Sequence, residues 1–298
     1  MTARQIKFKM TSNKLGYLLL LPLFAWLGVV IAFPVFYGVY LSFFDVPYGI
    51  IKKFVFLENY ASIFSDLKFR IAFVNSLIWT AGNIALQTAI GLGAALLLNK
   101  PIKGRDVGRV GILIPFIIPA FVTALVWRWM MEPDLGVFNA VLKQLHLIQK
   151  PIVPLVEYAM VTVIIENTWR FSPFAIIFIL SALQTVPRDV VDAAKVDGAG
   201  NLQIFRHVTL PIISPFLSFM GLLAFFWNFN LFDLIWLTTA GGPGSMTETL
   251  PVLIYRRSFR EFSMGEGAAI SVFSFIFMAI VTTILYFLPK IRLRGEKK

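Results

Sequence analysis

Residues 183–211 read LQTVPRDVVDAAKVDGAGNLQIFRHVTLP, and this polar stretch between two long apolar segments decides the fold. Pro187 suits the first position of a helix, and Asp189 complements the positive charge of a helix start. Gly198 and Gly200 then permit a reversal of the backbone. The stretch therefore predicts a helix–turn–helix. One face of its first helix is narrow, because short alanine side chains lie on it, and it consists of Val186, Val190, Ala193 and Ala194.

A second apolar stripe follows the turn and leads into the next apolar segment. It consists of Leu202, Phe205 and Val208 at helical spacing. On spacing alone, two interpretations stay open. The stretch is either an ordinary amphipathic loop that lies on a membrane, or a short helix that the surface of another protein approaches closely.

The composition of the chain excludes a water-soluble globular domain and a disordered chain. Hydrophobic residues make up 58% of the 298 residues and charged residues 14%, whereas soluble domains have about 25% charged residues. A membrane-spanning helix needs about 20 mostly apolar residues. We therefore predict an all-α membrane protein with six spanning helices, at residues 15–43, 72–98, 110–131, 155–183, 210–237 and 268–288.

The distribution of basic residues predicts the orientation. An even number of spans places both termini on one side, together with residues 99–109 and 185–208. Lysine and arginine are more than twice as dense on that side as in 44–70, 132–154 and 238–264. Because cytoplasmic loops of membrane proteins carry the excess of basic residues, both termini are predicted to be cytoplasmic. The net charge of +11 is thus assigned to these loops and not to nucleic-acid binding.

The chain lacks the residues of several chemistries. It has no cysteine and only His146 and His207, so disulfides, iron–sulfur clusters and multi-histidine metal sites are not expected. It contains no phosphate-cradling G-x-x-x-x-G-K-[ST] loop and no hydrolase or dinucleotide motif. We therefore expect a protein that is not an enzyme, binds no cofactor, and takes its energy from a partner or an ion gradient.

The polar loop also resembles a known family motif. Its pattern is similar to the EAA loop of binding-protein-dependent ABC importers, which reads E-A-A-x-x-D-G-A followed by an apolar stretch and L-P. An aspartate replaces the usual first glutamate here, which keeps the charge. In that family the loop forms a coupling helix that sits in a cleft of the ATPase subunit. The resemblance implies that role for Asp192, Ala193, Ala194, Asp197, Gly198 and Ala199.

Other stretches resemble the carbohydrate branch of the same family, the maltose-type permeases. They are LENY at 57–60, WRW at 127–129, FDLI at 232–235, GGPG at 241–244 and TETL at 247–250. The resemblance implies a type I ABC importer permease in a prokaryotic cytoplasmic membrane. It also implies a heterodimer with a second, homologous permease, two ATPase subunits that hold ATP and Mg, and an extracytoplasmic solute-binding protein that delivers a saccharide.

Ionisable and amide side chains interrupt two of the apolar segments. Glu166 and Arg170 are four residues apart with the glutamate first, which is the favourable order for a helical pair. One interpretation is a structural pair that neutralises itself. The other is that Arg170 faces the pathway and binds an acidic saccharide, because guanidinium matches a carboxylate in two places. The amides of Asn228 and Asn230 could hydrogen-bond between helices or bind sugar hydroxyls.

The resemblance also implies where a saccharide is held. In maltose-type permeases the two spans that flank the coupling loop form the sugar pocket. Amide groups suit sugar hydroxyls and aromatic faces suit their C–H surfaces. The candidate pathway residues in the matching stretches are Asn167, Arg170, Phe171, Phe174, Trp227, Asn228, Asn230 and Leu231.

We expect a cytoplasmic segment at 1–14, a six-helix permease domain at 15–289 with its coupling loop at about 185–208, and a basic cytoplasmic tail at 290–298. Three rival functions stay open. An ion-driven transporter would need coordinating carboxylates at broken helices, and a membrane-embedded enzyme would need a catalytic constellation. An ABC permease for a solute other than a sugar differs only in the carbohydrate-branch motifs.

Overall fold

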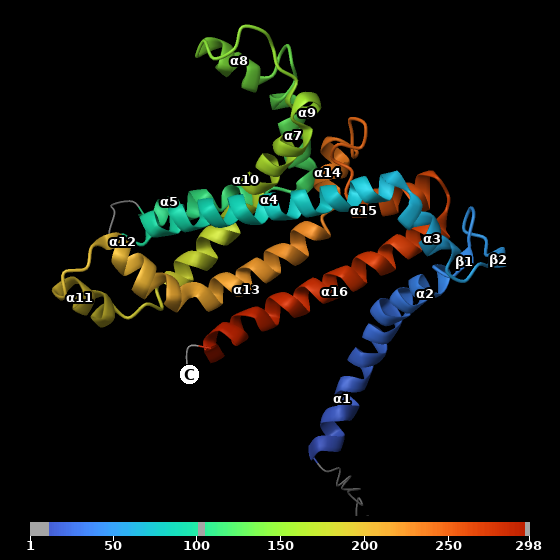
Figure 1. The fold of residues 1–298 in the computed structure, drawn as a ribbon, viewed down its shortest axis with the longest axis horizontal. Helices are drawn as coiled ribbons and strands as arrows, with labels where there is room; N and C mark the ends of the chain where they lie inside the picture. Colours follow the sequence, from blue (N-terminus) through green and yellow to red (C-terminus); the bar gives the residue numbers. More distant parts are fainter. Residues whose placement is uncertain (1–11, 101–104, 296–298) are drawn as a thin grey trace, which may run out of the picture.

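The computed structural model describes residues 12–100 and 105–295. Within them the protein is a bundle of long helices with a small two-stranded sheet at one end (Figure 1). Residues 1–11 and 296–298, most of the predicted cytoplasmic segment and part of the predicted basic tail, lie outside the described residues.

Five helical segments of the described residues are long and apolar enough to cross a membrane, and a sixth is formed if one bent pair counts as a span. This number agrees with the predicted six. The straight segments are Gly16–Leu41, Leu67–Leu98, Ala159–Leu183, Asn201–Phe229 and Met264–Phe287. They correspond to α1 (Ser12–Leu27) with η1 (Gly28–Ala32) and α2 (Phe33–Leu41), α4 (Leu67–Leu98), α10 (Ala159–Leu183), α12 (Asn201–Ile204) with η2 (Phe205–Thr209) and α13 (Leu210–Phe229), and α16 (Met264–Gly295).

The third predicted span, 110–131, is not one continuous helix. Its two arms, Val107–Ile117 and Ala120–Met130, meet at an angle of 92°. Ile118 is extended, with φ −68° and ψ 128°, because the ring of Pro119 disfavours helical geometry in the residue before it. Pro119 then precedes the first residue of the next helix. The arms consist of α5 (Arg105–Ile112) and α6 (Ile114–Ile117), then α7 (Ala120–Met130).

The fifth predicted span, 210–237, also ends earlier than expected. α13 stops at Phe229, and the short helix α14 (Asp233–Thr238) follows after a break. The amide of Asn230 donates to the carbonyl of Phe226 at 3.0 Å, a local bond that competes with helix continuation. Asp233 accepts from the backbone N–H of Leu234 at 2.9 Å and lies in the first turn of α14, where a negative charge complements the positive helix start. The polar side chains of Asn230 and Asp233 are exposed at this break.

Short elements join the spans. Figure 1 shows α3, β1 and β2 at the end of the molecule opposite α11, and α8 and α9 above the middle of the bundle. Strands β1 and β2 pair antiparallel, with Phe44 opposite Phe54. The elements are β1 (Phe44–Asp45), β2 (Lys53–Phe54), α3 (Glu58–Ser65), α8 (Val137–Gln144), α9 (Pro154–Glu157), α15 (Leu250–Tyr255) and η3 (Arg256–Arg260).

α10 is the central helix of the bundle. Within its most apolar stretch 61% of the residues are buried, against 0–22% for the other four straight spans. It packs tightly on α4 because α4 carries glycine at two contact points. A Cβ on Gly82 would lie 2.9 Å from the side chain of Ile164, and one on Gly91 would lie 2.9 Å from the Cβ of Ala175. Such close backbone approach is typical of helix packing in membranes.

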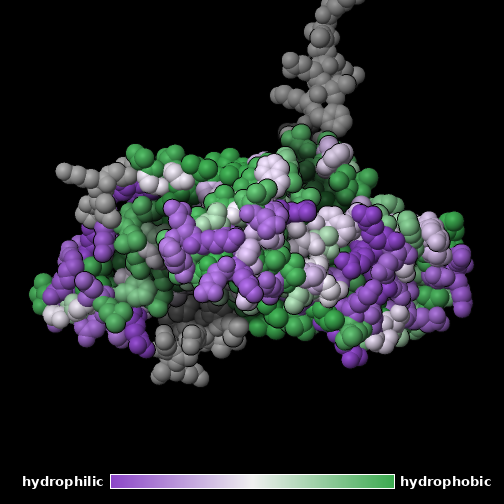
Figure 2. Space-filling model, turned by 90° about the horizontal axis from the view of Figure 1, so that it is seen from above, coloured by the Kyte–Doolittle hydropathy of each residue, from purple (hydrophilic) through white to green (hydrophobic). Residues whose placement is uncertain are grey.

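The surface of the chain is mostly apolar. α1 projects away from the bundle (Figure 1), and no residue in the apolar stretch of its span is buried. Figure 2 shows broad hydrophobic areas with hydrophilic residues gathered in separate groups. This is the surface expected for a chain surrounded by lipid and by other transmembrane subunits.

Candidate functional site

The loop between α10 and α13 has the predicted helix–turn–helix form. α11 spans Arg188–Val196, with Pro187 one position before the first helical residue and not at it. The turn occurs at Gly198, whose φ of +82° lies in the region that favours glycine. α12 then begins at Asn201 and continues through η2 into α13. The two helices that flank this loop, α10 and α13, are thus joined by one short helix–turn–helix connection.

α11 has no buried residue in this chain. It lies at one end of the molecule, far from the β1–β2 hairpin (Figure 1). Its contacts are local, such as the ion pair between Lys195 and Asp192 at 2.8 Å. Of the predicted coupling residues, Asp192, Ala193, Asp197 and Gly198 are exposed, and Ala194 and Ala199 are half-buried. The surface of α11 is therefore not covered by the rest of the described chain.

A ring of four buried amides joins α4, α10 and α13. The Nδ2 of Asn167 donates to the Oδ1 of Asn83 at 2.7 Å and to the Oδ1 of Asn228 at 2.8 Å. The ring closes through Gln87, which accepts from Asn228 and donates to Asn83, both at 3.3 Å. All four side chains are at most 5% exposed. Hydrogen bonds between amides offset the cost of burying them inside an apolar bundle.

The indole of Trp79 extends this connection between helices. Its Nε1 donates to the backbone carbonyl of Asn228 at 2.8 Å, and its own carbonyl accepts from the amide of Asn83 at 2.9 Å. Trp79 is 1% exposed. The end of α13 is therefore held to α4 through both side-chain and backbone groups.

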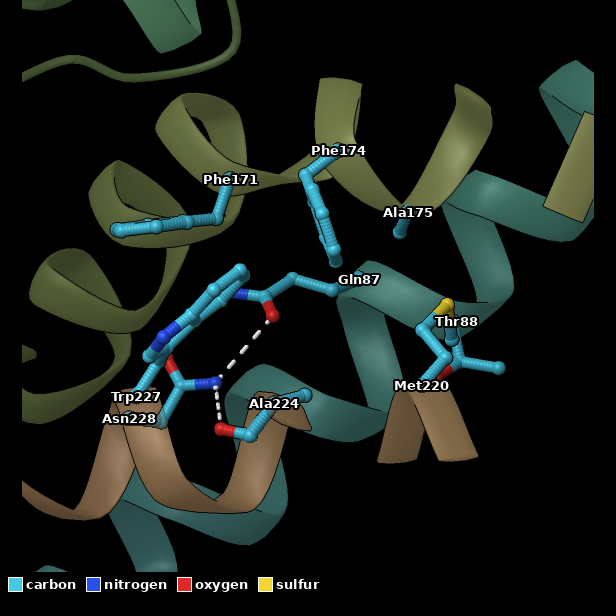
Figure 3. Close-up of a pocket in the computed structure, with 9 residues that line it drawn as sticks. All are labelled: Gln87, Thr88, Phe171, Phe174, Ala175, Met220, Ala224, Trp227 and Asn228. Atoms are coloured by element: carbon cyan, nitrogen blue, oxygen red, sulfur yellow. Dashed lines mark hydrogen bonds between the residues drawn. The ribbon is translucent and has the colours of Figure 1, made fainter. Parts of the chain in front are cut away.

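A small cavity of about 10 Å³, room for about one water molecule, lies beside the ring (Figure 3). Side chains from three helices surround it, with Phe171 and Phe174 of α10 facing Trp227 of α13. The rings of Phe174 and Trp227 meet edge to face at 4.7 Å between centroids. The full lining is Gln87, Thr88, Phe171, Phe174, Ala175, Met220, Ala224, Trp227 and Asn228.

An open hollow of about 660 Å³ lies at the break between α13 and α14. Its size falls within the range of small-ligand sites, about 300–1,000 Å³. Four aromatic rings, one amide and one carboxylate line it, a combination that suits a ligand with both hydroxyl groups and apolar faces. The lining residues are Phe171, Phe226, Trp227, Asn230, Leu231, Phe232 and Asp233.

The structure divides the predicted pathway residues into groups. Asn167 and Asn228 belong to the amide ring, in which buried amides form hydrogen bonds between helices. Asn228 also lines the small cavity. Phe174 lines the cavity but not the hollow. Asn230 and Leu231 line the hollow but not the cavity. Two residues, Phe171 and Trp227, line both.

Arg170 and Glu166 do not form an ion pair in the described part of the chain. The carboxylate of Glu166 is fully buried and accepts from the hydroxyl of Thr238, at 3.1 Å to each oxygen. The guanidinium of Arg170 lies instead 5.0 Å from the ring centroid of Phe171. The two groups thus lie on one helix without direct contact, and both interpretations of Arg170 stay predictions.

Sequence reasoning missed the contribution of α4. Asn83 and Gln87 complete the ring, and Thr88 completes the cavity. Two amides four residues apart inside an apolar span were the available signal, because they share one face of a helix. Phe226, Phe232 and Asp233 of the hollow were also missed.

The segment between α14 and η3 is fixed by buried polar contacts. Glu248 is fully buried and lies 3.1 Å from the Nε of Arg256, an ion pair in which the N–H does not point at the oxygen. The amide of Asn75 donates to the carbonyls of Ser245 and Glu248 at 2.8 and 3.1 Å. The backbone N–H of Leu250 donates to the hydroxyl of Ser76 at 2.8 Å. We call residues 239–266 the outer strap, because this segment connects α14 to α16 across α4.

A charged cluster holds the far end of the outer strap. Arg257 pairs with Asp66, with Glu261 at 2.7 Å and with Glu266 at 3.4 Å. Burial lowers the pKa of the Arg257 guanidinium, but the nearby carboxylates outweigh this effect and raise its pKa above the usual value. The arginine therefore stays charged at any physiological pH and links η3 to α4 and α16.

Comparisons with known proteins identify the family. Residues 87–293 match the model of the binding-protein-dependent transport system inner membrane component. This chain belongs to that family. The match includes α10, the α11 loop and α13, and it confirms the family that the EAA-type loop predicted.

The relatives of this permease cover nearly its whole length. It is 32% identical to the trehalose/maltose transport system permease protein MalF of Thermococcus litoralis, over 94% of this chain and 95% of MalF. It is also 32% identical to the sulfoquinovosyl glycerol transport system permease protein SmoG of Agrobacterium fabrum, over 91% of this chain and 88% of SmoG.

A solved structure has the same fold. A chain of the bacterial alginate ABC transporter, crystallised with an alginate pentasaccharide-bound periplasmic protein, superimposes with a TM-score of 0.82 at 20% identity. The superposition covers 94% of this chain and 95% of that one. The predicted type I importer permease fold is therefore confirmed, and the permease is an inner-membrane component.

Proposed function

We propose that this permease carries a saccharide across the cytoplasmic membrane as one half of a heterodimeric pathway. Two relatives with full-length similarity, MalF and SmoG, are named for sugar transport. The hollow supports the same class of substrate, since aromatic faces pack on the C–H surfaces of sugars and Asn230 and Asp233 can bond their hydroxyls.

The observation that carries this proposal is the position of the hollow relative to the coupling loop. Phe171 comes from α10 and Trp227 from α13, and these two helices are the ones that the α11 loop joins. A displacement of α11 therefore moves both walls of the hollow. Because the amide ring fixes α4, α10 and α13 to one another, the displacement moves them together.

In this mechanism the energy comes from outside the chain. Two ATPase subunits dock on the cytoplasmic side, hold ATP and Mg, and receive α11 through its exposed face. A second homologous permease closes the pathway, and a solute-binding protein delivers the saccharide from the outside. ATP binding closes the ATPases and turns the pathway outward, and hydrolysis returns it.

Reconstitution tests the function directly. The permease is purified with its proposed partner permease and ATPase subunits, placed in proteoliposomes, and supplied with the solute-binding protein and ATP. Import is measured for a panel of neutral and acidic saccharides and of amino acids. We expect ATP-dependent import of a saccharide. Import confined to amino acids or other non-sugars would overturn the proposal.

The acidic members of the panel are included because Arg170 forms no ion pair among the described residues. If it binds the substrate, Arg170→Gln should reduce import of acidic saccharides far more than import of neutral ones. Equal reduction of both, or import of neutral sugars only by the unaltered permease, leaves a structural role for this guanidinium.

The proposed orientation places both termini in the cytoplasm and residues 44–70 outside. Reporter domains fused at Lys298 and inserted into the 44–70 loop should report opposite sides of the membrane. Two reporters on the same side would contradict the six-span topology.

A further inference from the structure

The small cavity has a wall that the two spans flanking the coupling loop do not provide. Gln87 and Thr88 of α4 line it across from Phe174 and Trp227 (Figure 3). Gln87 is the one ring amide on α4 that reaches this cavity, since Asn83 is not part of its lining. α4 therefore adds a second amide to a cavity that otherwise has the amide of Asn228 beside aromatic and apolar side chains.

Gln87 is also the most weakly held member of the amide ring. Both of its ring bonds are 3.3 Å long, whereas those of Asn167 are 2.7 and 2.8 Å. Hydrogen bonds weaken as they lengthen past about 3 Å. The side chain of Gln87 can therefore leave the ring at lower cost than that of Asn167, and its departure leaves the Asn167 bonds to Asn83 and Asn228 in place.

Two aromatic side chains separate the cavity from the open hollow. Phe171 and Trp227 line both spaces, with 6.3 Å between their ring centroids. A cavity of about 10 Å³ cannot hold a sugar ring. If the two side chains rotate, the hollow of about 660 Å³ joins the cavity, and Gln87 then stands at its inner end.

We propose that Gln87 contacts the saccharide during transport. Its amide exchanges the two long ring bonds for bonds to a sugar hydroxyl, while Phe171 and Trp227 pack on the apolar faces of the same molecule. α4 is thereby a third wall of the substrate site. This inference rests on the proposed function, because it names a residue of the same site.

The absence of cysteine from the chain gives a clean test. In Gln87→Cys, the introduced thiol is the only one in this subunit, and the partner subunits are used in cysteine-free form. Proteoliposomes are treated with a small hydrophilic thiosulfonate during ATP-driven turnover, with and without the saccharide that the import panel identifies. Asn83→Cys is the matched control, because Asn83 belongs to the ring but not to the cavity lining.

We expect the Gln87→Cys thiol to be labelled during turnover and labelling to slow at least fivefold with the saccharide present. We expect the Asn83→Cys thiol to stay unlabelled. Labelling of the Gln87→Cys thiol at the same rate with and without saccharide, or no labelling during turnover, would overturn the inference.

A second variant guards against misfolding of the first. Gln87→Met keeps the length of the side chain and removes its donor and acceptor. We expect import of the same saccharide to fall about tenfold, the equivalent of about one hydrogen bond, with the thermal denaturation midpoint in detergent unchanged. Unchanged import, or a fall in import that follows a fall in the midpoint, would assign Gln87 a structural role only. If the unaltered permease imports no saccharide, the proposed function fails first, and the two failures are thus distinguishable.

Discussion

The outer strap and the α11 loop are both connections between spanning helices, yet they are built in opposite ways. Thr247, Glu248 and Leu250 of the strap are fully buried and bonded to α4 or to the strap itself. α11 has no buried residue, and its ion pair, between Lys195 and Asp192, lies within the helix. The strap is complete within this chain, whereas α11 exposes a surface that a partner can cover.

This difference predicts which substitutions reduce the stability of the permease and which reduce only its function. Changes in the strap should reduce the stability of the permease itself, because buried polar groups lose their partners. Changes in α11 should leave the permease folded and affect only the proposed coupling of transport to the ATPase subunits. The following variants test that division, from the largest expected loss of stability to the smallest.

Arg256→Met should give the largest loss. It leaves the fully buried carboxylate of Glu248 without its cation, which costs about 3–5 kcal/mol of unfolding free energy. Thermal denaturation in detergent, followed by size-exclusion chromatography, measures the loss. The double variant Arg256→Met/Glu248→Met is the control, since removal of both charges should recover most of the stability. A single variant as stable as the unaltered permease would show that the strap does not depend on this pair.

Asn167→Leu should give the next largest loss. It removes the donor to the Oδ1 of Asn228 and leaves this buried acceptor unsatisfied, at a cost of about 2 kcal/mol. Asn230→Leu is the matched control, because Asn230 is an exposed amide just after α13 and outside the ring, and we expect its effect within about 0.5 kcal/mol. Equal thermal denaturation midpoints for the two variants would show that the amide ring does not stabilise the permease.

Gly198→Val should separate stability from function. A β-branched residue at φ +82° strains the turn after α11 by about 1–2 kcal/mol locally. Because Gly198 is exposed and a Cβ there would meet no atom within 4 Å, we expect the denaturation midpoint and membrane insertion to be retained while ATP-driven import is lost. Gly200→Ala, at an ordinary φ of −71°, should keep import. Normal saccharide-stimulated ATP hydrolysis by the Gly198→Val permease would remove α11 from the coupling role.

Asp192→Glu should have the smallest effect. Its ion pair with Lys195 is exposed, and such pairs contribute less than about 0.5 kcal/mol. The longer side chain keeps the charge that the family loop carries at this position. We therefore expect no measurable shift of the midpoint and import close to that of the unaltered permease. Loss of import with Asp192→Glu but not with Lys195→Gln would show that the length of the carboxylate side chain matters to the partner.

Local signals in the sequence were sufficient for most positions of the spans and for the helix–turn–helix form of the α11 loop. Apolar length gave the positions of the helices, and the Gly198 turn followed from glycine spacing. The two errors in the spans, the bend at Ile118–Pro119 and the break after Phe229, come from single residues inside apolar runs. Because hydropathy is averaged over a window of residues, it does not detect the effect of a single residue. The proline itself was nevertheless a visible sign of the bend.

The candidate site was harder to predict because it is assembled from distant segments. Asn83 and Gln87 precede Asn167 by about 80 residues, and no spacing rule connects them. For the same reason the sequence could not distinguish an amide in the ring, such as Asn228, from one in the hollow, such as Asn230. That distinction depends on which side of α13 meets α4, a property of tertiary packing.

The polar content of α10 has a consequence for how the permease is made. α10 has the lowest mean hydropathy of the five straight spans, 1.4, and carries Glu166 and Arg170. Each ionised group costs about 2.5–3.5 kcal/mol at the centre of an inserting helix. α4 is synthesised earlier and offers its glycine-lined face and its amides, so it can shield the nascent α10 as the ribosome releases it. In a cell-free translocation assay, α10 should enter the membrane more efficiently behind α4 than behind α1 alone.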